Sequence, residues 1–203
     1  MFGLPDKTSL KKQLPKTAIY RKFNLNNSQK EQFDADISRI TIINEISPRS
    51  VNIEAGKEVS AFFVVHLLLK KLNFDSKNIE LITKLIDQNM LLVLEYENKA
   101  CLAVWRTKLI TSEWKNINEI TVPVSGLNLD AVWDNIIMQI GDIKVSDGNT
   151  LDEQITVDSE REKILKQIAK LEKQARAEKQ PKKKYELVSR IKDLNKEIFN
   201  YEK

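Results

Sequence analysis

Hydrophobic positions are densest between residues 59 and 105, and their pattern predicts the centre of a β-sheet. Residues 59–69 form the most apolar run of the chain, and residues 91–96 and 100–105 follow after one segment of helical periodicity. These runs are rich in β-branched and aromatic residues, which suit a pleated and largely buried surface. We therefore expect a long strand, then a helix, then a β-hairpin.

The rest of the first 141 residues predicts further strands and helices around this centre. Ser28 and Glu31 have the spacing of a capping box, which marks the start of a helix. The expected strands are residues 41–46, 51–53, 58–70, 90–96, 100–109 and 120–124, and the expected helices are residues 28–39, 76–88 and 128–140. The fold class is therefore α+β, with a mixed or antiparallel sheet and flanking helices.

A different periodicity begins at residue 158 and predicts two long helices. Pro181 separates them and fits the first turn of the second helix, where its missing amide is not needed. Apolar residues recur at heptad spacing on both sides of this proline: Ile164, Ile168, Leu171 and Ala175, then Leu187, Ile191, Leu194, Ile198 and Tyr201. We expect an antiparallel helical hairpin, a coiled coil, because neither helix would be stable without its partner.

These patterns divide the chain into three parts. Residues 1–141 form the α+β globular domain, and its first 24 residues are a basic arm with two Leu-Pro pairs. Residues 142–157 have turn chemistry and little apolar content, so we expect a linker. Residues 158–203 form the basic helical hairpin.

The basic charge belongs to the hairpin and not to the globular domain. The chain has a net charge of +4, yet residues 158–203 alone hold 14 Lys and Arg against 9 Asp and Glu. The candidate nucleic-acid-binding residues gather around the expected bend: Lys173, Arg176, Lys179, Lys182, Lys183 and Lys184. Like charges so close repel one another, and a phosphate backbone would relieve that repulsion. A solvated helical surface and a partner helix along the seam are the alternatives. Tyr185 is the one aromatic residue beside these cations, so base stacking is not expected there.

No residue pattern indicates a catalytic, cofactor or metal site. His66, the only histidine, shares a strand face with Phe62, Val64 and Leu68 and is expected to be a core or edge imidazole. Cys101 lies in an apolar strand and is expected to be a buried thiol. One histidine and one cysteine cannot form a zinc site, and glycine-rich phosphate loops are absent. We expect no cofactor, and the protein is more simply explained without an enzymatic activity.

A metal-dependent nuclease remains one alternative to weigh. The order of the expected elements is similar to a nuclease core that carries Glu-x-Lys on one strand, where carboxylates hold a divalent metal. Lys70 ends the long strand, but Leu68 stands where the acid would be, and leucine cannot bind a metal. Glu45, Glu54 and Glu58 are nearby acids without the required spacing. A degenerate relative of that fold is therefore the weaker form of this alternative.

Several short motifs resemble an uncharacterised bacterial family, catalogued as domain of unknown function forty-three ninety-one. They are Phe2-Gly3-Leu4-Pro5, Leu14-Pro15-Lys16, Asn52-Ile53 with Ala55-Gly56, the strand ending at Lys70, and residues 127–132 through Gln139-Ile140. The resemblance covers nearly the whole chain. It implies a gene near helicases and DNA methyltransferases of restriction or phage-defence loci, and it transfers no catalytic residue.

The expectation is a cytoplasmic, non-enzymatic accessory subunit of a bacterial DNA-processing or defence assembly. Its hairpin would contact the DNA or RNA backbone, and a helicase or methyltransferase would be its protein partner. The second expectation is a protein-interaction or dimerisation module that acts through the coiled coil. No membrane association is expected, because the longest apolar run is far shorter than the roughly 20 residues that span a bilayer.

Overall fold

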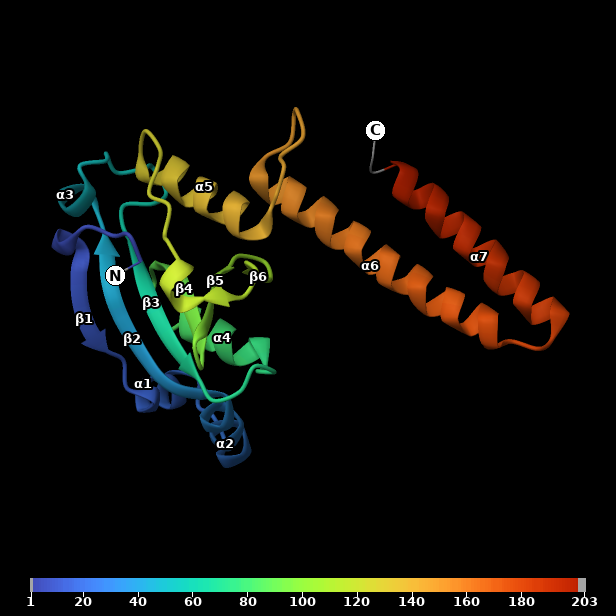
Figure 1. Ribbon diagram of the computed structural model, residues 1–203, viewed down its shortest axis with the longest axis horizontal. Helices are drawn as coiled ribbons and strands as arrows, with labels where there is room; N and C mark the ends of the chain where they lie inside the picture. Colours follow the sequence, from blue (N-terminus) through green and yellow to red (C-terminus); the bar gives the residue numbers. More distant parts are fainter. Residues whose placement is uncertain (1, 201–203) are drawn as a thin grey trace. The chain divides into compact units, whose positions relative to one another are not determined.

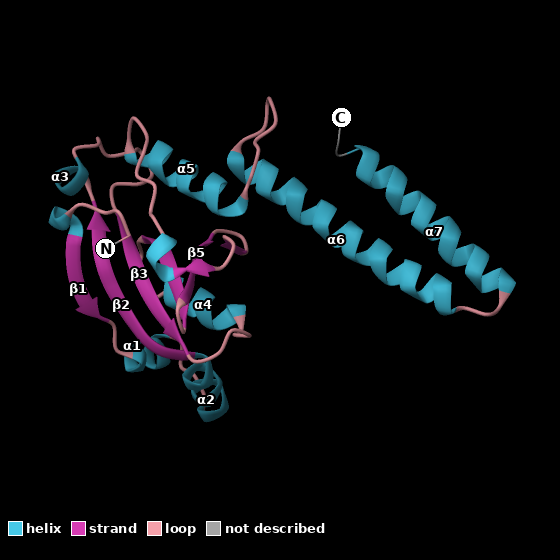
Figure 2. Cartoon of the chain, in the orientation of Figure 1, coloured by secondary structure: helices cyan, strands magenta, loops and turns pink. Residues whose placement is uncertain are grey.

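The computed structural model describes residues 2–200, and the chain divides between residues 143 and 144 into two compact units (Figure 1). We call the first the globular unit and the second the helical unit. The globular unit contains η1 (Asp6–Thr8), β1 (Ser9–Gln13), α1 (Lys16–Lys22), α2 (Asn27–Asp36), β2 (Ile37–Ile46), α3 (Pro48–Val51), β3 (Phe62–Leu69), α4 (Ser76–Thr83), β4 (Asn89–Tyr96), β5 (Lys99–Trp105), β6 (Leu109–Thr111), β7 (Lys115–Asn116), η2 (Ile117–Glu119) and α5 (Leu129–Gly141). The helical unit contains α6 (Leu151–Ala177) and α7 (Pro181–Asn200) (Figure 2).

A seven-stranded mixed sheet forms the centre of the globular unit. Its strands are arranged in the order β1-β2-β3-β4-β5-β6, and β7 pairs with β5 beside this path. The strands β3 and β4 are parallel, joined through α4, and the other pairings in the described chain are antiparallel. The predicted α+β class with a C-terminal helical region is therefore confirmed.

Both faces of the sheet are covered by apolar side chains. On one face, Ile19 of α1, Phe33 of α2 and Ile79 of α4 join alternate residues of β3 and β4 in a single core cluster. On the other face, Phe62 of β3 packs against Trp133 of α5, with ring centroids 5.1 Å apart. Burying side chains of this size contributes roughly 1.5–3 kcal/mol each, so these two layers dominate the stability of the unit.

The N-terminal arm is more ordered than the sequence indicates. Residues 9–13 form β1, an edge strand that pairs antiparallel with β2, and α1 follows it directly. All five residues of β1 are exposed, so they show no apolar alternation that could have predicted a strand. Lys11 has a positive φ of 51° within a register shift, and such an irregular, lysine-bearing edge resists pairing with another sheet.

Two predicted strands are wrong. Residues 48–51 form the single helical turn α3, closed by Asn52 in the left-handed conformation, so no strand covers residues 51–53. Pro48 in the first turn and the mutual capping of Ser47 and Ser50 favour that turn over an extended chain. Residues 120–124 also form no strand: the Val122 amide donates to the Phe2 carbonyl at 2.9 Å, so this segment pairs with the arm outside the sheet.

Two helix starts also differ from the prediction. The capping box of α2 is formed by Asn26 and Gln29, two residues before the predicted Ser28 and Glu31. The helix α6 begins at Leu151, so residues 151–157, predicted as linker, are helical. Its start is a capping box of Thr150 and Glu153, which was hidden in a stretch with few apolar residues.

A buried carboxylate fixes the junction of α2 and β2 to the start of α4. The Asp36 side chain is 1% exposed and accepts hydrogen bonds from the Asp75 amide and the Asn78 side-chain amide, both at 2.8 Å. Lys71 Nζ lies 2.6 Å from its other oxygen as an ion pair. Burial raises the pKa of Asp36, but Lys71, Asp75 and Asn78 together outweigh this and lower it below the ordinary 3.8.

We expect Asp36→Asn to lower the free energy of unfolding by about 1–3 kcal/mol at pH 7, because the change removes the charge that Lys71 and the donors stabilise. The difference from the wild type should shrink as the pH falls below 3.8 and through the lower folded-state pKa, since protonation then removes the same charge. Urea unfolding at pH 7 and pH 3 measures both values. Glu31→Gln, on the exposed part of α2, is the matched control and should change stability by less than about 0.5 kcal/mol. A difference that stays constant with pH would contradict this role.

Candidate functional site

The helical unit is held together by an apolar seam between α6 and α7. Ile164 and Ile168 of α6 and Leu194 of α7 are buried together. Leu171, Ile191 and Ile198 pack against them. These residues all belong to the predicted seam, so apolar heptad positions of the two helices do pack together. Tyr201 lies outside the described residues. A regular coiled coil stays a prediction. The seam determines which side chains of the two helices remain outside.

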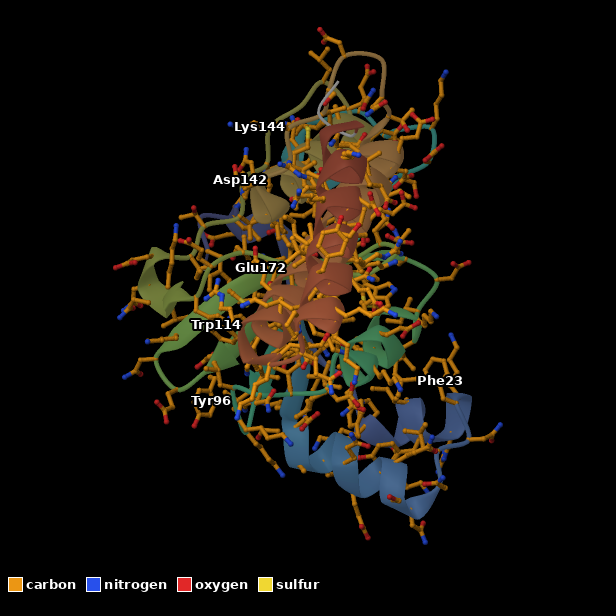
Figure 3. All side chains as sticks on the ribbon, turned by 90° about the vertical axis from the view of Figure 1, so that its right-hand side faces the viewer. Phe23, Tyr96, Trp114, Asp142, Lys144 and Glu172 are labelled. Carbon is orange, nitrogen blue, oxygen red and sulfur yellow. The ribbon has the colours of Figure 1, made fainter. Side chains whose placement is uncertain are left out.

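The six predicted nucleic-acid-binding residues all gather at the bend between the helices. Lys173 and Arg176 are in the last turns of α6, Lys179 is in the connecting segment, and residues 182–184 are in the first turn of α7. All six residues are exposed. Figure 3 shows the side chains of the chain as sticks and labels Glu172, a neighbour of Lys173 on α6. We call these six residues the basic tip. The structure thus brings together residues that span the whole connection.

The basic tip has few acidic neighbours. Glu172 lies 3.7 Å from Arg176, an exposed pair that contributes little. Glu178 accepts a hydrogen bond from the Gln180 amide at 2.8 Å and so is partly used by the backbone. The first turn of α7 contains no acidic residue, and its three lysines stand at the positive end of that helix. This arrangement is electrostatically unfavourable alone, and an anion at the tip would relieve it.

Two cations near the start of the chain, Lys16 and Lys22, are used differently. Lys16 Nζ donates to the Asp34 carboxylate at 2.6 Å and to the Ile37 carbonyl at 2.5 Å. Lys22 Nζ donates to the carbonyls of Lys84 and Leu85, just past the end of α4, at 2.6 and 2.9 Å. These two charges stabilise the fold, because cations at a helix C-terminus satisfy its free carbonyls.

The only histidine has an acidic partner that sequence reasoning missed. His66 Nε2 and Glu95 Oε2 form a hydrogen bond between the parallel strands β3 and β4, and both side chains are largely buried. The distance of 29 residues in sequence hides this pair, and only the register of the two strands reveals it. Among the described residues, no nucleophile and no third titratable group is bonded to either side chain, so the pair is consistent with the predicted core or edge imidazole.

The acids considered for a nuclease do not surround Lys70. Glu45 pairs in register with Phe63 at the start of β3, and Glu58 lies before that strand. Lys70 follows the other end of β3, which is eight residues or roughly 26 Å away. No group of three or more His, Cys, Asp or Glu side chains within residues 2–200 is arranged to hold a metal ion.

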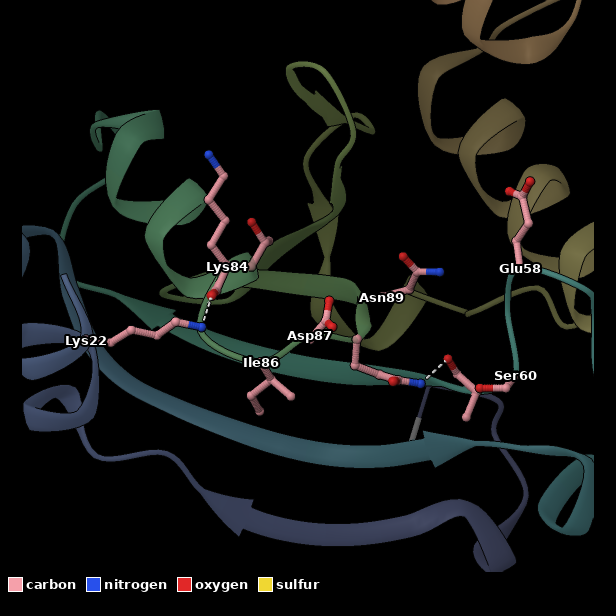
Figure 4. Close-up of a pocket in the computed structure, with 10 residues that line it drawn as sticks. Lys22, Glu58, Ser60, Lys84, Ile86, Asp87 and Asn89 are labelled. Atoms are coloured by element: carbon pink, nitrogen blue, oxygen red, sulfur yellow. Dashed lines mark hydrogen bonds between the residues drawn. The ribbon is translucent and has the colours of Figure 1, made fainter.

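A polar pocket of about 540 Å³ lies at the start of β3 and β4 (Figure 4). Lys22 and Lys84 line one end, and Glu58, Ser60 and Asn89 line the other. Lys22 is bonded to the end of α4, as described above, and Lys84 Nζ is paired with Glu80 at 2.6 Å. Both ammonium groups thus already have acceptors within the protein, and the pocket presents no convergent set of catalytic groups.

A tight loop before β3 encloses a carboxylate of α5. Asp130 accepts backbone hydrogen bonds from Val59 and Lys57 at 2.7 Å and from Glu58 at 3.2 Å. The bond from Val59, with those from Lys57 and Glu58, lowers the pKa of Asp130 despite some desolvation. A Cβ at Gly56 would lie 2.0 Å from Asp130 Oδ1, so any other residue would have to displace this hydrogen-bonded carboxylate or the loop. Gly56 and Asp130 belong to two separate motifs of the family resemblance, and the structure shows that they are in contact.

The single cysteine is buried, as predicted. Burial raises the pKa of the Cys101 thiol to about 12, so the thiol stays protonated near neutral pH. A nucleophilic role is therefore not supported by its surroundings.

Comparison with known proteins gives one family. The family model described as Domain of unknown function (DUF4391) matches residues 2–198, which is the family that the sequence resembles. No curated protein and no solved structure matches the chain. Within residues 2–200, no helix is long and apolar enough to cross a membrane.

We expect Gly56→Ala to lower the melting temperature by roughly 4–10 °C, because the new methyl group must displace the Asp130 carboxylate or the loop around it. Differential scanning calorimetry measures the shift. The same substitution in an Asp130→Ala background should cost much less, since the atom that it meets is then absent. An equal loss in both backgrounds would show that the contact with Asp130 is not the cause.

Proposed function

The chain belongs to the family described as Domain of unknown function (DUF4391), and on this premise we propose that it is a non-enzymatic accessory subunit of a bacterial DNA-processing or phage-defence assembly. Its basic tip binds the phosphate backbone of nucleic acid. The observation that supports this most directly is that Lys173, Arg176, Lys179, Lys182, Lys183 and Lys184 are all exposed at one bend.

Phosphate is the ligand that best fits the chemistry of the tip. A nucleic-acid backbone presents regularly spaced negative charges, and each lysine or arginine that meets a phosphate releases condensed counterions. Five of the six cations are lysines, flexible point charges that do not impose the bidentate geometry of base readout. Binding through this surface is therefore expected to be strong at low salt and independent of base sequence.

The protein partner we propose is a helicase or a DNA methyltransferase. The support for this class is the resemblance of the sequence motifs to the family, which implies a gene near such enzymes. The globular unit would provide the protein contact, and the basic tip would hold the nucleic acid. Purification of a tagged chain tests this part, because the product of a neighbouring helicase or methyltransferase gene should copurify with it. If neither a helicase nor a methyltransferase copurifies, this part of the proposal is contradicted.

Changing all six residues of the basic tip to glutamine should abolish most of the affinity for DNA. The slope of log K against log salt should fall by up to about 5, because about 0.9 counterions are released for each duplex phosphate neutralised. Fluorescence anisotropy of a labelled duplex from about 50 to 300 mM salt measures the slope.

The matched control changes six exposed lysines of the globular unit to glutamine: Lys7, Lys11, Lys12, Lys77, Lys99 and Lys115. This control keeps the same total charge as the tip variant, so it separates the local surface from the net charge of the chain. It should leave most of the slope intact. Equal slopes for the two variants, or no binding by the wild type, would refute the proposed function.

A second candidate function is self-association through the helical unit, and a specific apolar surface favours it. A pocket of about 620 Å³ beside the bend is lined by Leu171, Ala177 and Leu187 together with charged residues of both signs. Leu165 and Val188 are also exposed, at 48% and 39%. Leu165 and Val188 are not part of the seam, and exposed apolar groups of this kind are suited to contact with a second helical pair.

If this surface joins two copies, the double change Leu165→Glu and Val188→Glu should convert a dimer to a monomer, because it places carboxylates in the buried contact. Light scattering on a size-exclusion column, over a range of protein concentrations, gives the mass. The control Glu160→Gln lies on α6, outside this surface, and should not change it. A wild-type chain that is monomeric at every concentration would exclude this second function.

A further inference from the structure

One aromatic residue beside the basic tip is largely exposed to solvent. Tyr185, in the second turn of α7, is 76% exposed. It has no hydrogen bond, ring contact or ion pair with another described residue. A tyrosine ring is a large apolar surface, and in the globular unit the ring of Tyr20 packs edge-on against Phe33. The exposed face of Tyr185 is therefore free to contact a ligand.

The position of Tyr185 on α7 explains why the helix pairing does not bury it. Leu187, Ile191 and Leu194 continue the seam of α7, and Leu194 is buried in it. Tyr185 precedes Leu187 by two residues, and positions two apart point to different sides of a helix. The ring is thus excluded from the contact with α6 by the helical phase and not by a local distortion.

Helical spacing places Tyr185 on the same side of α7 as one cation of the tip, Lys182, three residues before it. Side chains of a helix lean toward its N-terminus and cover the preceding turn. For Tyr185 the preceding turn contains Pro181 and Lys182, and Lys184 is its direct neighbour. A flat apolar face therefore stands beside groups that attract phosphate, which is the combination found in surfaces that bind single-stranded nucleic acid.

We infer that Tyr185 is a stacking platform for an unpaired nucleobase and that the basic tip prefers single strands, overhangs or junctions to uninterrupted duplex. This inference rests on the proposed function, because the cations must first attract the backbone. In a duplex the faces of the bases are covered by their neighbours, so a tyrosine can stack only on a base that is free. The expectation from sequence, that no stacking occurs at the bend, is thereby revised: stacking needs one accessible ring, and the structure supplies it.

The test compares two fluorescein-labelled probes with the full chain. One is a thymidine single strand of about 20 nucleotides, and the other is a blunt duplex of about 20 base pairs, in the length range of the sites that such surfaces cover. Tyr185→Leu should weaken binding of the single strand by about 5- to 150-fold, the effect of losing one stacked base. Binding of the duplex should change by less than about twofold, because its phosphates still meet the six cations.

Two further variants keep the test specific to the ring. Tyr185→Phe retains the aromatic face and should bind both probes as the wild type does. Val188→Ala, one turn further along α7 and also partly exposed, removes apolar surface without an aromatic ring and should leave both affinities unchanged. Circular dichroism of each variant at 222 nm, the standard helix wavelength, reports whether the two helices remain formed.

An abasic probe makes the conclusion independent of any substitution. A strand of the same length and charge without bases should bind the wild-type chain about 5- to 150-fold more weakly than the thymidine strand. Equal binding of the abasic and thymidine strands would overturn the stacking inference. If the duplex still binds in a salt-dependent way that the six-glutamine variant loses, the proposed function survives that result. If neither probe binds the wild type, both fail together.

Discussion

The parallel pairing of β3 and β4 is the constraint on which the globular unit depends. Their residues are apolar on both sides of the strands, so both faces of the sheet must be covered. A parallel connection also requires a crossover, and α4 provides it. The helices α1, α2 and α4 then fill one face, while α5 covers the other through Trp133 and its neighbours. The enclosed carboxylates Asp36 and Asp130 hold the ends of these covering helices in register with the strands.

Positive charge is used in two different ways along the chain. In the globular unit, Lys16, Lys22 and Lys71 bond to carboxylates or to helix carbonyls, so their charges serve the fold. At the basic tip, the lysines extend from the facing ends of α6 and α7 and from their connection, and no ion pair with an acidic side chain is shown for them among the described residues. A charge that is neutralised inside the protein cannot also attract a phosphate. This contrast, and not the net charge of the chain, distinguishes the tip from Lys16 and Lys22 of the N-terminal arm.

Some parts of the candidate site could be predicted from the sequence, and others could not. The cations of the tip lie within twelve residues of one another around Pro181, so their proximity follows from local chain geometry alone. The heptad residues likewise identify Ile164, Ile168 and Leu194 as the contact, since helical periodicity is a local property. By contrast, the pairing of His66 with Glu95 and the contact of Gly56 with Asp130 depend on segments far apart in the chain. The exposed side of Tyr185 depends on which face of α7 the partner helix covers.

The sequence by itself determined the α+β class, the strands β3, β4 and β5, the helices α4 and α5 and the two helices of the C-terminal unit. Each of these has a strong apolar period or a clear cap, and such signals act over a few neighbouring residues. Only the tertiary structure decided that residues 9–13 become an edge strand and that residues 120–124 pair with the arm outside the sheet. Residues 9–13 are all exposed and show no apolar alternation, whereas the β-branched residues of 120–124 favour an extended chain without selecting its partner. The hydrogen-bonding groups of β2 and of Phe2 therefore make the choice for both segments. Local sequence determines secondary structure where buried positions recur periodically. Tertiary contacts determine it where a partner strand provides most of the stabilisation.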